Sequence, residues 1–251
     1  MTSPLEGRRI LVTGVLSPRS IAFAIASAAQ RAGAELVLTS FGRAMGLAEK
    51  SAARLSPVPP VLDVDLTDGD RVRGAIEEIH GRWGGLDGAV HSVAFAPADC
   101  FGGNFLNAPW ESVRTALEVS SYSLATLARE VSPVMPESGG SIVALTFDGS
   151  YAWPLYDWMG PAKAALEAIA RYLARDLGGR QIRVNCISAG PLETLAAKSI
   201  PGFDRLRHQW QEQAPLGWDT TDTTPVADAS VFLLSQMSRG ITGEVLHVDG
   251  G

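Results

Sequence analysis

Seven short apolar segments, each separated from the next by an amphipathic stretch, constrain the fold of this chain more than any other feature. They read RILVTG, ELVLT, PVLDVD, DGAVHS, SIVALT, IRVNCIS and EVLHVDG, at 9–14, 35–39, 60–65, 87–92, 141–146, 182–188 and 244–250. The first, fourth and fifth are almost continuously hydrophobic, which is typical of strands buried on both faces of a parallel sheet. We therefore expect seven strands.

Helical patterns fill the gaps between these segments. They cover roughly 20–32, 43–55, 69–83, 110–132, 157–178 and 223–237. Ser20 is a suitable N-cap for the first helix, and Gly33 a suitable stop. Strand and helix in alternation predict an α/β fold: a doubly wound, parallel, seven-stranded Rossmann sheet with helices on both faces.

The chain is expected to form a single domain over 1–251. Its hydrophobic fraction of 46% is enough for a sizeable core, and no Ser/Gly-rich linker, charge block or repeat divides it. One crossover is unusually long. Residues 190–222 contain the helical patterns LETLAAKSI and FDRLRHQWQEQ, and such sheets place substrate-binding insertions outside the carboxyl end of a strand.

Charge and cysteine content exclude several classes of protein. A net charge of −6 argues against nucleic-acid binding, which normally needs a basic face. No apolar run reaches the ~18 residues of a membrane span, and MTSPLEGRRI lacks the pattern of a signal peptide. Cys100 and Cys186 match no metal spacing, which predicts buried thiols and no metal site. These features predict a cytoplasmic protein.

A dinucleotide site is predicted where the first four strands end. Gly14 lies where the chain leaves the first strand and must approach a pyrophosphate; Ser20 and Ile21 then open a helix whose N-terminus favours an anion. The stretch lacks the second and third glycines of G-x-G-x-x-G and is weak alone. Asp65 is suited to accept from an adenine amino group. The small residues in Ser92-Val93-Ala94 let a cofactor lie against the backbone.

The end of the second strand bears on the choice between NADH and NADPH. The stretch LVLTSFGR has no acid there to hold a ribose 2′-hydroxyl. Phe41 is instead suited to stack on adenine, while Arg43 is either a 2′-phosphate ligand or a solvated residue of the next helix. We expect NADH rather than NADPH.

Tyr156 and Lys163 in YDWMGPAK are the candidate catalytic pair. Pro161 belongs in the first turn of a helix, because it has no amide hydrogen. Tyr156 then lies on the lead-in and Lys163 one to two turns inside. Seven residues are close to two turns, at ~3.6 residues per turn, so both side chains can face one cleft. The alternative is a core tyrosine and a solvated lysine, and His91 is expected to be structural.

Several stretches together resemble the enoyl-acyl-carrier-protein reductases, a branch of the short-chain dehydrogenase/reductase superfamily. The similarity covers essentially the whole chain and has its most specific feature in the six-residue gap between Tyr156 and Lys163. The matching stretches are TGVLSPRSIAFAIA, HSVAFAP, GGNFLN, TFDGSYAWPLYDWMGPAKAALEA and SAGPLETLAAKSIPGF. The resemblance implies reduction of trans-2-enoyl thioesters, carried by acyl-carrier protein or coenzyme A, in fatty acid biosynthesis.

The resemblance also implies roles for individual residues. Tyr156 would donate to the thioester carbonyl, Lys163 would bind the nicotinamide ribose, and Phe147 would shape the substrate end. The positions that match cofactor contacts are Gly14, Ser20, Ile21, Asp65, Leu66, Ser92, Leu192 and Thr194. The residues that either form an apolar slot for the acyl chain or belong to the ordinary core are Phe147, Tyr151, Trp153, Leu192, Ile200 and Phe203.

Three departures from the family pattern matter. Ala94 stands where most relatives have glycine, which adds a methyl group beside the nicotinamide. The segment from 195 to 218 is shorter than in the branch that elongates very long chains, so an ordinary acyl chain is expected. The sequence stops at VDGG, where relatives continue across a subunit interface. The homotetramer implied by the family therefore has less support here.

Alternative functions remain open at this point. Because of Ala94, a paralogue that acts on another unsaturated thioester remains an alternative. A ketoreductase is disfavoured, because ketoreductases have a four-residue spacing between the Tyr and the Lys. A non-catalytic nucleotide-binding relative is disfavoured by the intact Tyr156 and Lys163. Lys198, Arg205 and Arg207 are either a docking patch for an acidic carrier protein or an ordinary solvated face.

Overall fold

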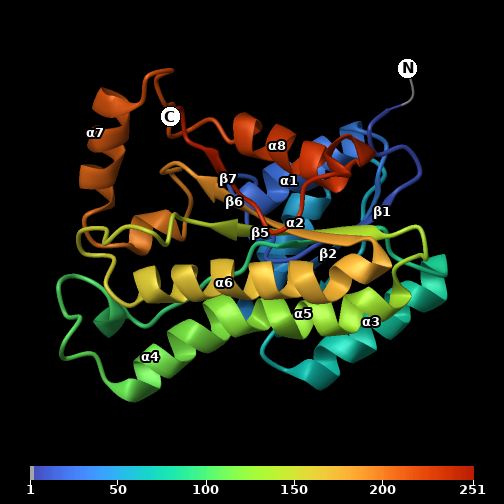
Figure 1. The fold of residues 1–251 in the computed structure, drawn as a ribbon, viewed down its shortest axis with the longest axis horizontal. Coiled ribbons are helices and arrows are strands. Elements are labelled where there is room, and N and C mark those ends of the chain that lie inside the picture. Colours follow the sequence, from blue (N-terminus) through green and yellow to red (C-terminus); the bar gives the residue numbers. More distant parts are fainter. Residues whose placement is uncertain (1–2) are drawn as a thin grey trace.

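Seven parallel strands form a single sheet at the centre of the computed structural model, which describes residues 3–251 (Figure 1). The strands are β1 (Arg9–Val12), β2 (Glu35–Ser40), β3 (Val61–Asp63), β4 (Gly88–His91), β5 (Gly140–Thr146), β6 (Ile182–Ala189) and β7 (Val245–Val248). Their order in the sheet is β3-β2-β1-β4-β5-β6-β7, and every neighbouring pair is parallel. The predicted doubly wound α/β fold is confirmed.

Helices cover both faces of this sheet. They are α1 (Ile21–Arg31), α2 (Met45–Ala52), α3 (Gly69–Trp83), α4 (Trp110–Leu117), α5 (Ser123–Val131), α6 (Met159–Leu177), α7 (Phe203–Gln213) and α8 (Thr224–Leu234). In Figure 1, α1 and α8 lie above the sheet, while α3, α5 and α6 lie below it. Helix α7 stands apart at the left, on the side toward which β5 and β6 point.

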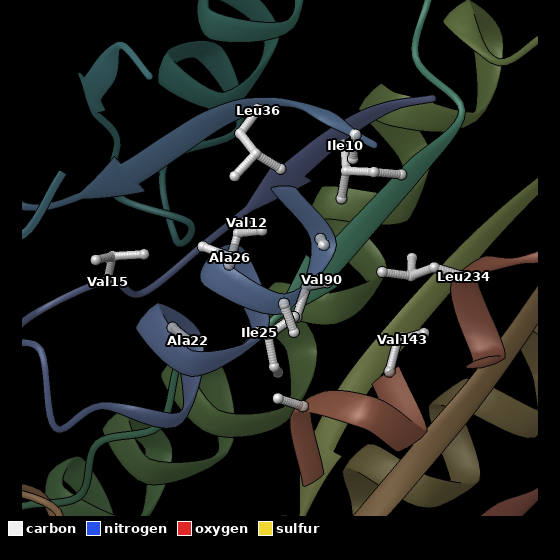
Figure 2. Packing of buried hydrophobic residues seen from close by; sticks show 14 of the residues in the cluster. Ile10, Val12, Val15, Ala22, Ile25, Ala26, Leu36, Val90, Val143 and Leu234 are labelled. Carbon is white, nitrogen blue, oxygen red and sulfur yellow. The ribbon is translucent and has the colours of Figure 1, made fainter. Parts of the chain in front are cut away.

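Side chains alternate between the two layers along each strand. Ile10 and Val12 of β1 pack in the cluster that contains α1 and α8, whereas Leu11 between them packs with α3, α5 and α6. Figure 2 shows Val12 and Val90 together with Ile25 of α1 in the first of these clusters. Because both faces of β1 are buried, its sequence is apolar at successive positions.

Several predicted elements differ in length from the observed ones; the last strand, for example, covers only Val245–Val248, and the helical pattern at 192–200 forms only a 3₁₀ turn, Ala197–Ser199. The strand expected over 60–65 has only three residues, since the chain turns at Asp65, whose Oδ1 accepts from the Thr67 amide at 2.9 Å. The helix expected over 110–132 consists of α4 and α5 joined by a π-helical turn, Glu118–Tyr122. Within residues 3–251, no helix combines the length and apolarity needed to cross a lipid bilayer.

Candidate active site

A cleft of about 920 Å³ opens at the carboxyl ends of the strands. Ligands of open α/β sheets bind outside this edge, at the point where the strand order reverses. Here that point lies between β1 and β4, which are neighbours although β2 and β3 separate them in sequence. The sheet topology therefore places the cleft where a nucleotide is expected.

All the residues predicted to contact a cofactor line this cleft. They are Gly14, Ser20, Ile21, Phe41, Asp65, Leu66, Ser92, Val93, Ala94, Lys163, Leu192 and Thr194. Tyr156 and Phe147, the other two predicted catalytic residues, line it as well. The fold thus brings together residues from the segments that follow six different strands, β1 to β6.

Gly14 makes the closest backbone approach in the nucleotide half of the cleft. It has a φ of +76°, and a Cβ atom built there would lie 2.1 Å from the Ser92 carbonyl oxygen. Thr13 holds the two strands at this spacing: its Oγ1 donates to the Val90 carbonyl at 2.9 Å and accepts from the Ser92 amide at 3.3 Å. A side chain at position 14 would collide with the backbone at Ser92, so the ends of β1 and β4 can lie this close together only with glycine there.

The N-terminus of α1 faces the same space and suits a pyrophosphate. Ser20 caps it, since its Oγ accepts from the Phe23 amide at 3.2 Å and donates to the Ser17 carbonyl at 2.7 Å. The first turn of α1 holds no acidic residue, so nothing in that turn opposes an anion. Together with Gly14, this end of the helix fits a dinucleotide.

The end of β2 forms the adenine side of the cleft. Phe41 is 50% exposed and lines the cleft. Arg43 is also exposed but is not among the residues that line the cleft. An acid that the sequence analysis did not single out lies here: Asp63, at the end of β3, accepts from the Gly42 amide at 3.1 Å. Its carboxylate places negative charge beside the turn that follows β2.

Tyr156 and Lys163 line the cleft and are both buried. Tyr156 is 6% exposed and precedes α6, and Lys163 is 7% exposed and lies in its second turn. Pro161 is in the first turn of α6, as predicted. Lys163 Nζ donates to the Leu145 carbonyl at 2.9 Å, which anchors the ammonium at the end of β5. The alternative of a solvated lysine is wrong.

Burial shifts the acid–base behaviour of this pair. It raises the pKa of Tyr156 well above the ordinary value for a phenol, so the hydroxyl remains a neutral donor at physiological pH. It lowers the pKa of Lys163 to about 8, although the charge of Glu167 and the thiol of Cys186 oppose the shift. Lys163 thus remains mostly protonated at pH 7.

The polar neighbours of the pair have structural roles. His91 is fully buried and its Nε2 pairs with Ser123 Oγ at 2.8 Å. Burial, and next the charge of Lys163, lower the pKa of His91 to about 3, so the ring is neutral. Glu167 accepts from Thr146 Oγ1 and from the Gly149 amide, both at 2.9 Å, which ties the end of β5 to α6. His91 is thus a buried, neutral histidine, but only one of its two ring nitrogens is satisfied, since Nδ1 has no hydrogen-bond partner within the described residues.

The backbone on both sides of Tyr156 is left-handed. Leu155 has a φ of +63° and Asp157 a φ of +40°. Such a conformation costs an L-residue about 1–3 kcal/mol and persists only where the surroundings enforce it. The Asp157 Oδ2 atom accepts from the amides of Gly103 and Asn104, at 2.6 and 2.9 Å. The sequence analysis missed this constraint.

An aromatic cluster closes the substrate end of the cleft. Phe147 meets Tyr156 edge-on with ring centroids 5.5 Å apart, and it packs against Trp153 at 4.9 Å. Trp210 of α7 completes the cluster, 5.7 Å from Phe147 and 5.3 Å from Trp153. The sequence analysis did not find Trp210, because only the fold brings α7 against the loop after β5.

Four of the six residues predicted to form an acyl slot line the cleft. Phe147, Leu192, Ile200 and Phe203 line the cleft, together with the unanticipated residues Phe101, Met159 and Leu206. Trp153 and Tyr151 are absent from the described lining. Trp153 supports Phe147 from behind, and Tyr151 is 63% exposed. The wall therefore combines aromatic and aliphatic side chains.

The proposed basic patch is partly neutralised within the chain. Arg207 pairs with Glu193 at 3.4 Å and with Asp204 at 3.3 Å, so its charge is compensated. Lys198 and Arg205 are exposed. The Glu193 amide also donates to the Thr220 carbonyl at 2.8 Å, which closes the base of segment 190–222.

The π-helical turn between α4 and α5 connects the two halves of the cleft. Ser120 Oγ both donates to the Phe95 carbonyl and accepts from the Phe95 amide, at 2.9 Å each. Ser121 Oγ donates to the Ala162 carbonyl at 2.7 Å, next to Lys163. Within residues 3–251, no group of three or more acidic, histidine or cysteine side chains could hold a metal ion.

Comparison with known proteins agrees with this geometry. The family model described as enoyl-(acyl carrier protein) reductase matches residues 14–251. The enoyl-[acyl-carrier-protein] reductase [NADH] of Mycolicibacterium smegmatis is 42% identical, over 100% of this chain and 98% of that protein. A Staphylococcus aureus relative at 41% identity, over 98% of this chain and 97% of its own, is named for NADPH instead.

A solved structure extends the likeness to three dimensions. The enoyl-acyl carrier protein reductase of Bacillus cereus, crystallised with NADP⁺ and an indole naphthyridinone, matches with a TM-score of 0.94. It is 39% identical, and the match covers 99% of this chain and 97% of that one. Family model, full-length identity and fold agree, so this chain belongs to the enoyl-acyl-carrier-protein reductase family.

Proposed function

We propose that this protein reduces the carbon–carbon double bond of trans-2-enoyl thioesters carried by acyl-carrier protein, in fatty acid biosynthesis, with NADH as the reductant. The observation that supports it most is one cleft in which a neutral buried tyrosine, a buried lysine and an apolar wall adjoin a glycine turn. A coenzyme A thioester is a chemically equivalent substrate.

The chemistry follows from where charge develops. Bound NADH supplies a hydride to the β-carbon of the thioester, and electron density moves onto the carbonyl oxygen. The Tyr156 hydroxyl donates a hydrogen bond to that oxygen, and one such donor contributes ~3–4 kcal/mol to transition-state stabilisation. The α-carbon then takes up a proton, which completes the reduction.

Lys163 holds the cofactor rather than the substrate in this proposal. Its ammonium has three protons, of which one goes to the Leu145 carbonyl. The others are suited to the two hydroxyls of the nicotinamide ribose. Phe147, edge-on to Tyr156, limits where the thioester can lie.

The preference for NADH is supported by the charge at the end of β2. Asp63 accepts from the Gly42 amide in the turn that follows β2; it does not itself line the cleft, but its charge disfavours a 2′-phosphate at that turn. Arg43, the group that would attract one, is exposed and outside the described lining. The names of the relatives differ on this point, since some specify NADH and others NADPH.

The assay that tests this function measures NADH oxidation with trans-2-enoyl thioesters of short, medium and long chains, repeated with NADPH. We expect turnover of an ordinary-length chain and a clear preference for NADH. If NADH binds but every linear enoyl thioester is left unreduced, the proposal is wrong. Equal rates with both cofactors would remove only the NADH preference.

Ala94 favours a second candidate, a paralogue for another unsaturated thioester. Ala94 lines the cleft, at a position where the family resemblance implies glycine. This candidate predicts turnover of branched or substituted enoyl thioesters and none of linear ones. An Ala94→Gly variant would then gain activity on linear chains.

We further propose a cytoplasmic homotetramer. Large exposed aromatic side chains support association: Trp110 of α4, Tyr122 of the π-helical turn and Tyr172 of α6 are 57–65% exposed. Exposed aromatic side chains of this kind are enriched at subunit interfaces. Light scattering on the purified protein should give four times the chain mass of 26.5 kDa, and a monomeric mass would contradict it.

A further inference from the structure

Asp157, the residue after the proposed catalytic tyrosine, joins two segments far apart in the sequence. We propose that Asp157 is a positioning residue: its carboxylate fastens loop 98–105 to segment 153–158 and thereby fixes the orientation of Tyr156 in the cleft. The inference rests on the proposed function for the role of Tyr156. The attachment itself is independent of that function.

The carboxylate is the centre of a set of hydrogen bonds between these two segments. Its Oδ2 accepts from Gly103 and Asn104. The bonds on either side are between backbone groups: the Gly102 amide donates to the Leu155 carbonyl at 3.0 Å, and the Trp158 amide donates to the Cys100 carbonyl at 3.2 Å. The residues on both sides of Tyr156 are therefore held by the same loop.

The backbone of segment 153–158 needs such an attachment. Leu155 and Asp157 are both left-handed, so the chain changes direction immediately before and after Tyr156. Asp and Asn enter this region more readily than other non-glycine residues, but a leucine does so only under constraint. Without the carboxylate, the segment is free to relax, and the phenol moves with it.

The loop on the other side of the attachment also forms part of the cleft. Phe101 lines the cleft, and its ring centroid is 6.2 Å from that of Tyr156. Trp158 stacks on Phe105 with centroids 4.7 Å apart and donates from its indole Nε1 to the Phe105 carbonyl at 2.8 Å. Asp157 thus fixes the position of the Tyr156 phenol and of the loop that carries Phe101 beside it.

Three substitutions distinguish the effect of losing the carboxylate acceptor from the effect of disfavouring the positive φ at position 157. Asp157→Asn keeps an acceptor oxygen and tolerates a positive φ. Asp157→Gly tolerates the same φ but has no acceptor. Asp157→Ala lacks both. We expect kcat within about threefold of wild type for Asp157→Asn, and a loss of about tenfold or more for the other two, because misplaced groups lose transition-state interactions.

The split between kinetic constants distinguishes positioning from general damage. A misplaced Tyr156 lowers kcat, whereas the dissociation constant for NADH should stay at the wild-type value. Asp87→Ala is the matched control. Asp87 also accepts from a backbone amide, that of Arg9 at 2.9 Å, but it lies at the amino edge of the sheet. It should lower Tm and leave kcat unchanged.

A spectroscopic readout does not depend on turnover. The chain has four tyrosines, so 3-fluorotyrosine labelling gives four ¹⁹F resonances, and Tyr156→Phe identifies one of them. In Asp157→Gly this resonance should shift or broaden, while in Asp157→Asn it should remain in place. The measurement stands even if the wild-type protein reduces no enoyl thioester, an outcome that would contradict only the proposed function.

Two results would overturn the inference. One is Asp157→Gly with wild-type kcat and an unchanged Tyr156 resonance. The other is Asp157→Asn losing as much activity as Asp157→Gly, since the acceptor oxygen would then be irrelevant. If Asp157→Ala does not fold, the comparison of Gly with Asn still decides between these outcomes.

Discussion

The two halves of the cleft are built in different ways. The nucleotide half depends on backbone atoms and small side chains: the close approach of Gly14 to Ser92, and the Ser20 cap. The acyl half depends on large side chains from distant segments, with Trp210 of α7 packed against Phe147 and Trp153. The nucleotide half has almost no space for an added atom beside Gly14, whereas the side chains of the acyl half can repack around a substitution.

This difference predicts different consequences for substitutions. A change in the nucleotide half should weaken cofactor binding whatever the substrate, because a backbone contact has little room to adjust. A change in the acyl half should alter preference among substrates, because aromatic packing is graded. Tyr156 and Lys163 lie where the halves meet, and the effects there should be largest.

The largest expected effect is that of Tyr156→Phe. We expect kcat to fall by about one to three orders of magnitude, since the substitution removes one transition-state donor. The NADH dissociation constant and Tm should change little, because the ring still packs against Phe147. Tyr151→Phe is the control, as that hydroxyl is exposed and outside the described lining. Steady-state kinetics on the best enoyl thioester measure both, and undiminished turnover would remove Tyr156 from the mechanism.

Lys163→Ala should weaken NADH binding by about 10–100-fold, the range for a hydrogen bond from a charged group, ~1.5–3 kcal/mol. Because burial lowers the pKa of Lys163 to about 8, its charged form is lost as pH rises through that value. NADH affinity of the wild type should therefore decline above about pH 8. Lys163→Arg stays charged and should flatten this dependence. Fluorescence titrations across pH test it; an unaltered affinity in Lys163→Ala would contradict the assignment.

The same pKa has the opposite effect on stability. Between about pH 8 and 10.5 the unfolded chain retains the Lys163 proton that the folded chain has released. The contribution of this residue to the free energy of unfolding therefore rises with pH across that window. Chemical denaturation of the free protein at several pH values should show the rise, and Lys163→Ala should lack it.

Gly14→Ala tests the rigidity of the nucleotide half. The added Cβ would meet the Ser92 carbonyl oxygen at 2.1 Å, so the turn must move away from Ser92. The positive φ alone costs about 1–3 kcal/mol, and displacement of the turn should raise the NADH dissociation constant about tenfold. Gly84→Ala is the matched control, because its φ is +73° but its Cβ would have no neighbour within 4 Å. If Gly14→Ala binds NADH as tightly as Gly84→Ala does, the contact with Ser92 does not matter for cofactor binding, and Gly14 is needed only for its positive φ.

Trp210→Ala should have the smallest and most selective effect. An aromatic pair contributes about 0.5–1.5 kcal/mol beyond its buried area, which corresponds to a change of about 2–10-fold in KM for the preferred thioester. Longer chains should become relatively better substrates, because space opens behind Phe147. Trp83→Ala, a partly buried tryptophan at the end of α3, should leave KM unchanged. The same KM for every chain length in Trp210→Ala would exclude a part in specificity.

The sequence predicted the fold and the lining of the nucleotide half well, because both are local. Each strand shows as an apolar run, and Gly14, Ser20 and Asp65 follow directly from the ends of such runs. Trp210 and Asp157 were missed for the opposite reason. Their contacts join residues more than 50 positions apart, and neither periodicity nor spacing records which distant loops meet. Asp63 was missed because it lies inside a predicted strand rather than at its end.

The π-helical turn at Glu118–Tyr122 has a consequence for how the family can vary in length. It directs two consecutive hydroxyls, Ser120 and Ser121, to opposite partners: the loop after β4 and helix α6. Deletion of one residue there would rotate everything downstream by about 100° about the helix axis, and α5 would present a different stripe to the sheet. Surface loops absorb insertions, whereas this turn fixes the rotational position of α5 relative to the sheet. Natural and engineered changes in chain length should therefore avoid it.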